Sequence, residues 1–338
     1  MTAAASPHGH LRAHADVLHE GTALDAGLAI AAGAQGLTFI AVTAPVTTAA
    51  AVLEVPVLRA DEPRAAWTAG ELTIVGLGAA RELRGTGADR WAQIVDAARR
   101  LQVAGAVIDG VAMPVSALGL ARPRLIGGAA FAPGAADRAP WAGFGDAWFM
   151  LPRWTYVRHG SDAHLVLAVD ARTAGAGRWR DELAQLLAVP APRAPRPQPA
   201  LVELQRAGAD EWRTQVVDIT DAIAAGACSK IVAARTATLQ LAGAVRAPDL
   251  LATLDQRHAE CVRVLIQPPD AGALVAATPE QLVRRDGQLV SCDALAGTRS
   301  IGIGDDAARD RRVADASAAL LASPKDRREH DLVVDAIR

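Results

Sequence analysis

The fold is decided by the stretch Gly272-Ala-Leu-Val-Ala-Ala-Thr-Pro-Glu-Gln-Leu-Val-Arg-Arg-Asp-Gly-Gln-Leu-Val-Ser-Cys-Asp-Ala-Leu-Ala-Gly-Thr-Arg299. Its apolar runs predict three short strands, over 273–277, 281–284 and 288–293, with a proline break and an Asp-Gly turn between them. Glu280 lies where two of these strands meet, and a carboxylate between buried strands is costly unless it is used or paired. Gly297 allows a backbone N–H to approach a ligand closely. The stretch therefore predicts a site for a small molecule.

Composition limits the classes of partner. The 338 residues are 51% hydrophobic and 21% charged, which is enough for one large core or two moderate ones. The net charge is −2, and no basic stripe is interleaved with aromatics, so we expect no nucleic-acid partner. The three cysteines, Cys228, Cys261 and Cys292, form no CxxC motif. They predict buried thiols in a reducing compartment.

Residues 26–53 carry no charge, as a membrane span would. They are mostly Ala, Gly and Thr, and they include Gln35 and Pro45. This composition favours a buried helix followed by a strand over a membrane span. No apolar segment of a secretory signal precedes them. We therefore expect a cytoplasmic protein without a membrane partner.

The first half of the chain reads as a loosely ordered start over 1–20, with four histidines, followed by alternating strands and short helices over 21–189. We expect strands over 37–43, 71–76 and 165–169, a helix over 91–101, and a compact Gly- and Trp-rich β-region over 124–154. The glycines of Gly76-Leu77-Gly78 are interpreted as a turn. A dinucleotide fingerprint is not supported, because Arg81 stands where its third glycine or alanine is required.

Residues 190–199 contain five prolines and predict an extended connector to the second half, 200–338. In this half we expect helices over 212–225 and 249–260 and strands over 231–241 and 262–267. Lys230 precedes the first of these strands. Only Lys230 and Lys325 are lysines in a chain with 35 basic residues. Arginine cannot lose its proton in a protein, whereas a desolvated lysine can, so a retained lysine suggests a base.

The last segment begins with a helix-start signature, Ser323-Pro324-Lys325-Asp326. Glu329 follows on the apolar face, with Asp326 one turn before it on the same side. Two inward carboxylates suit a hard cation such as Mg²⁺, whereas a pair between Lys325 and Glu329 would suit a solvated face. Periodicity leaves both readings open. The apolar pattern still runs at Arg338 without a capping glycine, so we expect the sequence to be incomplete at its C-terminus.

Four motifs carry a resemblance to a known family. They are Ser-Lys-Ile-Val-Ala-Ala-Arg at 229–235, Ala-Thr-Pro-Glu-Gln-Leu at 277–282, Asp-Ala-Leu-Ala-Gly-Thr-Arg at 293–299 and Lys-Asp-Arg-Arg-Glu-His at 325–330. In order and spacing they resemble the chorismate-utilising enzymes, specifically the isochorismate synthases, which open menaquinone and catecholate-siderophore synthesis. The resemblance covers about residue 20 to the end. It implies an α+β fold with two layers of largely antiparallel sheet and outer helices, whose C-terminal part is missing here.

The resemblance also implies roles for individual residues. Lys230 would be the general base that activates water for attack at C2 of chorismate, and Glu280 the general acid that protonates the departing C4 hydroxyl. Gly297, with Ala296 and Thr298 beside it, would line the substrate. Paired acid and base groups of this kind are each worth about 10²–10⁴-fold in rate.

The same resemblance implies Mg²⁺ as the cofactor. Glu329 would hold the ion, which would bind the substrate carboxylate, and Asp326 would assist as an outer or second metal group. The small-molecule partner would be chorismate. Anthranilate and aminodeoxychorismate synthases carry Pro-Ile where this chain has Ala294-Leu295, so we expect no glutaminase subunit. We expect a monomer for the complete protein.

Two alternatives stay open. Salicylate synthases share Lys230 and Glu280 and add pyruvate elimination. In the family a further segment supplies a second metal-binding glutamate, an arginine and closing strands. A non-catalytic fragment of such an enzyme is therefore the other hypothesis, and it predicts little or no turnover by these 338 residues.

Overall fold

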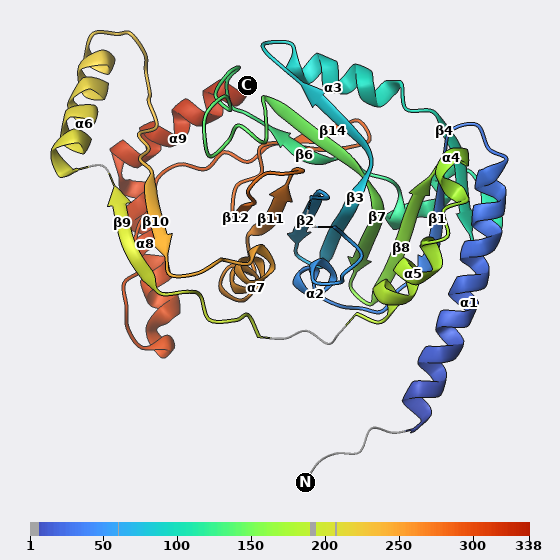
Figure 1. The fold of residues 1–338 in the computed structure, drawn as a ribbon. Helices are drawn as coiled ribbons and strands as arrows, with labels where there is room; N and C mark the ends of the chain where they lie inside the picture. The colour runs from blue at the N-terminus through green and yellow to red at the C-terminus, as the bar shows by residue number, and fades with distance from the viewer. Residues whose placement is uncertain (1–6, 60, 190–193, 207) are drawn as a thin grey trace. The chain divides into compact units, whose positions relative to one another are not determined.

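The computed structural model describes residues 7–59, 61–189, 194–206 and 208–338. These residues form two compact units (Figure 1). The first unit consists of Met1–Pro197 together with Val245–Thr278, and the second of Gln198–Ala244 together with Pro279–Arg338. Residues 245–278 follow the proline-rich connector in sequence and nevertheless fold with the first unit.

The α-helices are α1 (Pro7–Ala32), α2 (Ala49–Leu53), α3 (Arg90–Arg99), α4 (Ala171–Ala174), α5 (Trp179–Leu187), α6 (Ala209–Ala224), α7 (Ala247–Arg257), α8 (Arg309–Ala322) and α9 (Pro324–Ile337), and the 3₁₀ helices are η1 (Val115–Ala121) and η2 (Asp306–Ala308). The strands are β1 (Leu37–Thr43), β2 (Arg64–Ala69), β3 (Leu72–Gly85), β4 (Val103–Ile108), β5 (Val111–Met113), β6 (Ile126–Ala129), β7 (Ala147–His159), β8 (Asp162–Val169), β9 (Leu201–Arg206), β10 (Ala237–Leu241), β11 (Val262–Gln267), β12 (Leu274–Thr278), β13 (Arg284–Asp286) and β14 (Leu289–Ser291).

One ten-stranded sheet organises the first unit. Its order is β12-β11-β2-β3-β7-β8-β1-β4-β5, and β6 pairs with β7. The pairing of β1 with β4 is parallel, and the other pairings in this sheet are antiparallel. In the second unit, β9 pairs with β10 and β13 with β14, each as a two-stranded antiparallel sheet. The expected α+β class with largely antiparallel sheet is confirmed.

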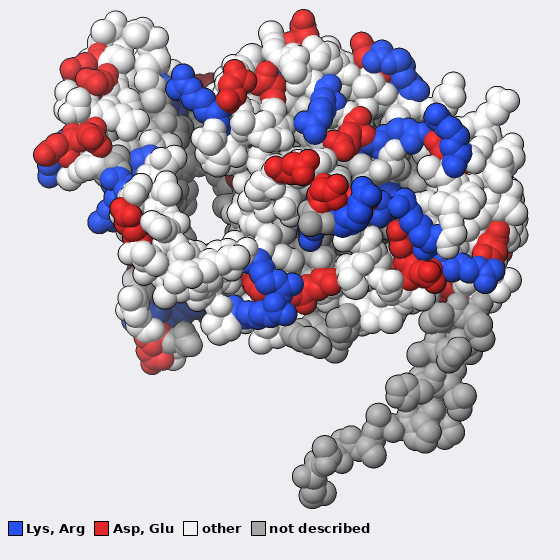
Figure 2. Space-filling view, viewed as in Figure 1, with Lys and Arg blue, Asp and Glu red and all other residues white. Residues whose placement is uncertain are grey.

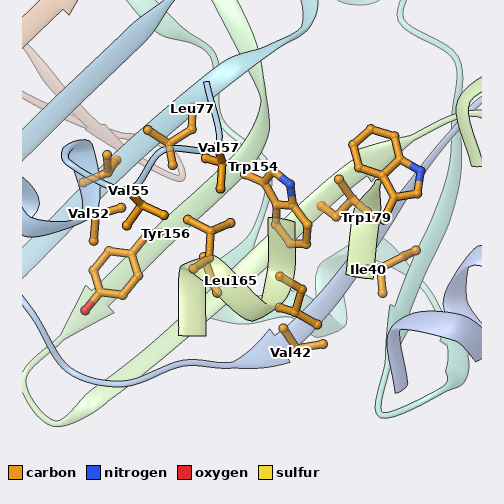
Figure 3. Close-up of a cluster of buried hydrophobic side chains, with 14 of the residues drawn as sticks. Ile40, Val42, Val52, Val55, Val57, Leu77, Trp154, Tyr156, Leu165 and Trp179 are labelled. Atoms are coloured by element: carbon orange, nitrogen blue, oxygen red, sulfur yellow. The ribbon is translucent and has the colours of Figure 1, made fainter. Parts of the chain in front are cut away.

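The main core lies on one face of the ten-stranded sheet (Figure 3). Because alternate residues of a strand point to the same face, Trp154 and Tyr156 of β7 lie on this face with Leu165 of β8. Helices α1, α2, α5 and α7 contribute side chains to the same cluster, among them Trp179, which is 2% exposed. The opposite face carries a second cluster that includes Phe39, Val157 and Leu118 of η1.

The two glycines that were expected in a turn lie inside β3, so that prediction is wrong. Gly76 packs against the ring of Pro152, where a Cβ atom would lie 2.6 Å from Cγ. Gly78 has a φ of +62°, and a Cβ atom there would lie 2.8 Å from the guanidinium carbon of Arg153. The register of β3 against β7 shifts between Ala79 and Arg81. Close packing against β7 and this bulge, rather than a turn, require the glycines.

Most predicted strands and helices are present with shifted ends. The strand over 37–43 is β1, and the strand over 262–267 is β11. The strand expected over 231–241 is shorter, because residues 230–236 are irregular and β10 begins at Ala237. The strand expected over 281–284 is wrong, since β13 begins only at Arg284. Of the thiols expected to be buried, only Cys261 is buried, Cys228 is half-buried and Cys292 is exposed, and all three are free.

At the N-terminal end, residues 1–6 lie outside the described residues, and from Pro7 onward the expected loose start is helical. Residues 190–193 of the proline-rich connector also lie outside the described residues. In the part of the chain that the structure describes, no helix has the length and apolarity that a membrane crossing requires. The uncharged segment 26–53 forms the end of α1, then β1 and α2, which agrees with the predicted helix and strand.

Candidate active site

Helix α9 of the second unit presents the two predicted metal-binding carboxylates. Ser323 is its N-cap, and its hydroxyl accepts a hydrogen bond of 3.3 Å from the backbone N–H of Asp326. The cap stabilises the first turn, and because Asp326 and Glu329 are three residues apart, they lie about one turn apart on the helix. Both residues are half-buried, and their neighbours Arg327 and Arg328 are exposed. The predicted start of this helix is confirmed, and both carboxylates lie on its less exposed face.

Lys230 reaches the carboxylate of Glu329. Its Nζ lies 3.9 Å from Glu329 Oε1, and the two side chains are 28% and 40% exposed. Lys230 lies in the irregular segment between α6 and β10. Among the described residues, Glu329 is thus paired with Lys230 rather than with its helix neighbour Lys325, which is exposed. Of the two readings that periodicity left open, the surface pair of Lys325 and Glu329 is the one not observed.

Gly297 packs against the other carboxylate of α9. Its φ is +80°, which favours glycine, and a Cβ atom at this position would lie 3.2 Å from Asp326 Cβ and 3.4 Å from Asp326 Oδ1. Ala296 is half-buried like Gly297, whereas Thr298 is exposed. The structure therefore brings the Leu-Ala-Gly-Thr segment to the carboxylate-bearing face of α9 by a close backbone approach.

Arg299 is a site residue that was not predicted. Its Nη2 lies 4.0 Å from Asp326 Oδ2, and the Asp326 side chain is only 16% exposed. The two carboxylates of α9 are therefore faced by two cations, Lys230 and Arg299. The available signal was the position of Arg299 directly after the Gly-Thr step, at the end of the same motif.

Glu280 is placed differently from the prediction. It is exposed rather than buried between two strands, because the chain is irregular from Pro279 until β13 begins at Arg284. The next residue, Gln281, pairs with Asp293: its N–H donates to Asp293 Oδ2 over 3.1 Å, and the N–H of Asp293 donates back to Gln281 O over 3.1 Å. This pairing joins the Glu280 segment to the start of the segment that carries Gly297.

The donor set fits a hard divalent cation. Mg²⁺ is bound in proteins by one or two carboxylates, and its other positions are filled by water or by substrate oxygens. Asp326 and Glu329 offer two such carboxylates on one face of a helix, and neither is a soft ligand that would select another metal. The nearby cations Lys230 and Arg299 suit an anionic substrate, because they would face its carboxylates.

Comparison with known proteins identifies relatives of this chain. The family model described as "Chorismate binding enzyme" matches residues 31–338. The salicylate biosynthesis isochorismate synthase of Pseudomonas aeruginosa is 34% identical over 284 residues, which is 80% of this chain and 55% of the relative. The isochorismate synthase MenF of Bacillus subtilis is 29% identical over 287 residues, which is 79% of this chain and 56% of the relative.

A solved structure supports the fold. The menaquinone-specific isochorismate synthase MenF from Escherichia coli superimposes with a TM-score of 0.63 at 21% identity, covering 93% of this chain and 67% of that one. The chain spans about half the length of the curated relatives named above.

Proposed function

Because the chain belongs to the chorismate-binding enzyme family, we propose that it carries the catalytic groups of an isochorismate synthase, an isomerase that converts chorismate into isochorismate. Two relatives that match most of the chain bear this name. The observation that carries the proposal is the meeting of Lys230 with Glu329, at 3.9 Å, within the second unit. This pair places a candidate base and a candidate metal-binding carboxylate within reach of one anionic substrate.

In the proposed reaction, Lys230 removes a proton from water while the water oxygen forms a bond to C2 of chorismate. The ring double bonds shift, and the C4–O bond breaks. Glu280 gives its proton to the departing C4 hydroxyl, which leaves as water. One water is consumed and one is released, so the reaction is an isomerisation. At the end of the reaction Lys230 has gained one proton and Glu280 has lost one. Proton exchange with solvent returns both groups to their starting states.

Glu329 and Asp326 would hold Mg²⁺, which would supply positive charge for a substrate carboxylate. Glu329 also pairs with Lys230, so a bound Mg²⁺ and the Lys230 ammonium group would share the Glu329 carboxylate. Gly297 supports the site by leaving room beside Asp326, and Ala296 and Thr298 flank it. Any side chain at residue 297 would press on the Asp326 carboxylate and also require a strained backbone.

Substitutions of the two lysines test the proposed role of Lys230 as the base. Chorismate and MgCl₂ are added to the purified protein, and products are separated by chromatography. Lys230→Ala and Lys230→Arg should both lower isochorismate formation by about 10²–10⁴-fold, because arginine keeps the charge beside Glu329 but cannot act as a base. Lys325→Ala is the matched control, since Lys325 is exposed, and it should retain full activity.

Each outcome has a clear meaning. Near-normal activity in Lys230→Arg would show that Lys230 acts only through its charge, and the role of base would be wrong. Salicylate together with pyruvate would assign the chain to the salicylate synthases. Chorismate binding without product would support the other alternative, a non-catalytic fragment of such an enzyme. A chain that neither binds nor converts chorismate would refute the proposal.

We further propose that the product enters menaquinone or siderophore synthesis, and that the protein acts as a monomer without a glutaminase subunit. These proposals rest on the motifs at 229–235, 277–282, 293–299 and 325–330. Sedimentation of the purified protein and its activity without ammonia or glutamine would test the last two.

A further inference from the structure

A cavity of about 490 Å³ lies within the first unit, whereas every residue of the proposed site belongs to the second. It is formed where the end of α2, the start of β2, the turn between β11 and β12 and the start of α7 come together. Small-molecule sites in proteins typically measure about 300–1,000 Å³. The walls include apolar side chains such as Leu53, Pro56 and Pro248, and two arginines, Arg64 and Arg246.

Arg246 is already compensated by carboxylates. Its Nη2 lies 2.7 Å from Glu54 Oε1, and its Nη1 lies 3.7 Å from Asp249 Oδ2. Figure 2 shows basic and acidic side chains next to one another in the region where Figure 1 labels α2 and α7. Even so, Arg246 Nη1 is buried and makes no hydrogen bond. One donor of this arginine is therefore left for another acceptor.

Arg64 is not compensated. Within the described residues its side chain makes no ion pair or hydrogen bond, and its Nε is buried. The side chain is half-buried at the first position of β2, and burial lowers the pKa of its guanidinium. A half-buried cation without a carboxylate is unfavourable unless something else supplies the negative charge. Gln267, opposite Arg64 in the register of β2 and β11, adds an amide group to the same wall.

We propose that this cavity binds a small organic carboxylate, whose carboxylate group pairs with Arg64 and whose body packs on the apolar wall. The planar guanidinium matches a carboxylate with two parallel hydrogen bonds. Glu54 and Asp249 both face Arg246, so only Arg64 lacks a carboxylate, and a single negative charge fits better than a dianion such as phosphate. The apolar residues favour a ligand with a ring or short hydrocarbon body over a bare inorganic anion.

The test compares two probes of almost equal shape. Benzoate and its neutral analogue benzamide are titrated into the purified chain by isothermal calorimetry at constant ionic strength. Benzoate should bind saturably and benzamide should not, because the charge-assisted hydrogen bonds to Arg64 carry the affinity. Arg64→Gln should weaken benzoate binding about ten- to hundredfold. Arg138→Gln, the same substitution at an exposed arginine outside the cavity, should leave binding unchanged.

Two further variants locate the binding. Glu54→Gln releases Arg246 from its ion pair and should tighten benzoate binding severalfold, because a second guanidinium becomes available. Lys230→Ala should leave benzoate binding unchanged, which separates this cavity from the proposed active site. The melting temperature of each free variant reports on folding. Arg64→Gln should not lower it, since the substitution removes an uncompensated charge.

Several results would overturn the proposal. If Arg64→Gln and the parent chain bound benzoate equally well, Arg64 would not be part of the binding site. Equal binding of benzamide would show that the cavity selects only apolar bodies. Tighter binding of inorganic phosphate than of benzoate would give the wrong ligand class. Loss of benzoate binding in Lys230→Ala would place the probe in the active site instead.

Discussion

Substitution of Arg153 tests how much its buried ion pairs contribute to the stability of the first unit. The Arg153 side chain is 6% exposed, and its guanidinium forms an ion pair with Glu62, donates to Val57 O over 3.3 Å and lies 3.7 Å from Glu182 Oε1. Arg153→Met keeps most of the volume and removes the charge. It leaves the carboxylates of Glu62 and Glu182, 15% and 10% exposed, without this partner.

Removing one partner of a buried ion pair typically costs about 3–5 kcal/mol. Glu182 keeps other partners, since Trp154 Nε1 donates to it over 2.6 Å and Arg178 lies 3.5 Å away. Glu62 keeps the backbone N–H of Arg59 at 3.0 Å. We therefore expect the lower part of that range, about 3 kcal/mol. This is a large fraction of the ~5–15 kcal/mol by which a domain is stable.

Urea denaturation at pH 7, followed by tryptophan fluorescence, measures this loss. Trp148, Trp154 and Trp179 are buried in the first unit and report its unfolding. The double variant Glu62→Gln/Arg153→Met should lose about 1–3 kcal/mol less than the sum of the two single variants, because it buries no unpaired carboxylate. A loss below about 1 kcal/mol in Arg153→Met, or strict additivity in the double variant, would refute the reasoning.

The same pair predicts a pH dependence. Burial raises the pKa of Glu62, but hydrogen bonds from Arg153 and from the backbone of Arg59 outweigh it, so the pKa lies below its ordinary value of 4.5. The pair therefore contributes fully above about pH 4.5 and loses its contribution as the pH falls through the pKa of the folded state. The difference in stability between the parent chain and Arg153→Met should shrink below that pH.

Three further predictions concern single positions. Asp170 accepts a hydrogen bond of 2.7 Å from Arg81, and chiefly this bond lowers its pKa to about 2. Asp170→Asn should therefore reduce the free energy of unfolding by on the order of 1–2 kcal/mol at pH 7. In denaturation curves this loss should vanish as the pH falls from 3.8 to about 2. Gly127→Ala should cost about 3 kcal/mol or more by urea denaturation, because the new Cβ would lie 2.1 Å from the Trp148 carbonyl oxygen. Tyr156→Phe should cost about 1–2 kcal/mol in the same assay, since its buried hydroxyl accepts from the N–H of Thr47 over 2.9 Å.

Elements with a strong local pattern could be predicted from the sequence. The strand over 37–43 is a run of apolar and β-branched residues without a charge, and the structure gives β1 the same bounds with only its last residue exposed. The start of α9 was predicted because Ser323, Pro324 and Asp326 form a local capping signal, which is observed as a hydrogen bond. Such signals depend on neighbouring residues alone, so they need no knowledge of the fold.

Features that depend on distant contacts could not be predicted from local pattern. Gly76 and Gly78 resemble turn glycines, but what requires them is Pro152 and Arg153 on a strand far along the chain. Periodicity could not decide the partner of Glu329, because Lys230 is remote in sequence and reaches it only in the folded second unit. The family resemblance supplied both residues as site residues, whereas their pairing required the structure.

The exposure of Glu280 shows a different limit. The apolar residues Leu282 and Val283 suggested a buried strand after Pro279, but they are 84% and 60% exposed. Every residue of strands β13 and β14 is also exposed. The apolar sequence pattern predicts burial, but among the described residues no other element covers these side chains.

The assignment of β11, β12 and α7 to the first unit bears on how this polypeptide can be made or divided. On the ribosome, the large sheet cannot be completed until Thr278 has emerged, well after the proline-rich connector. Until then β2 is an edge strand with unpaired backbone groups, and the core lacks Leu251 and Leu265, which are both fully buried in the finished unit. A gene cut at the connector would fix this unfinished state permanently. To produce the first unit alone, a gene would instead have to join residues 245–278 directly to the segment that ends at Pro197.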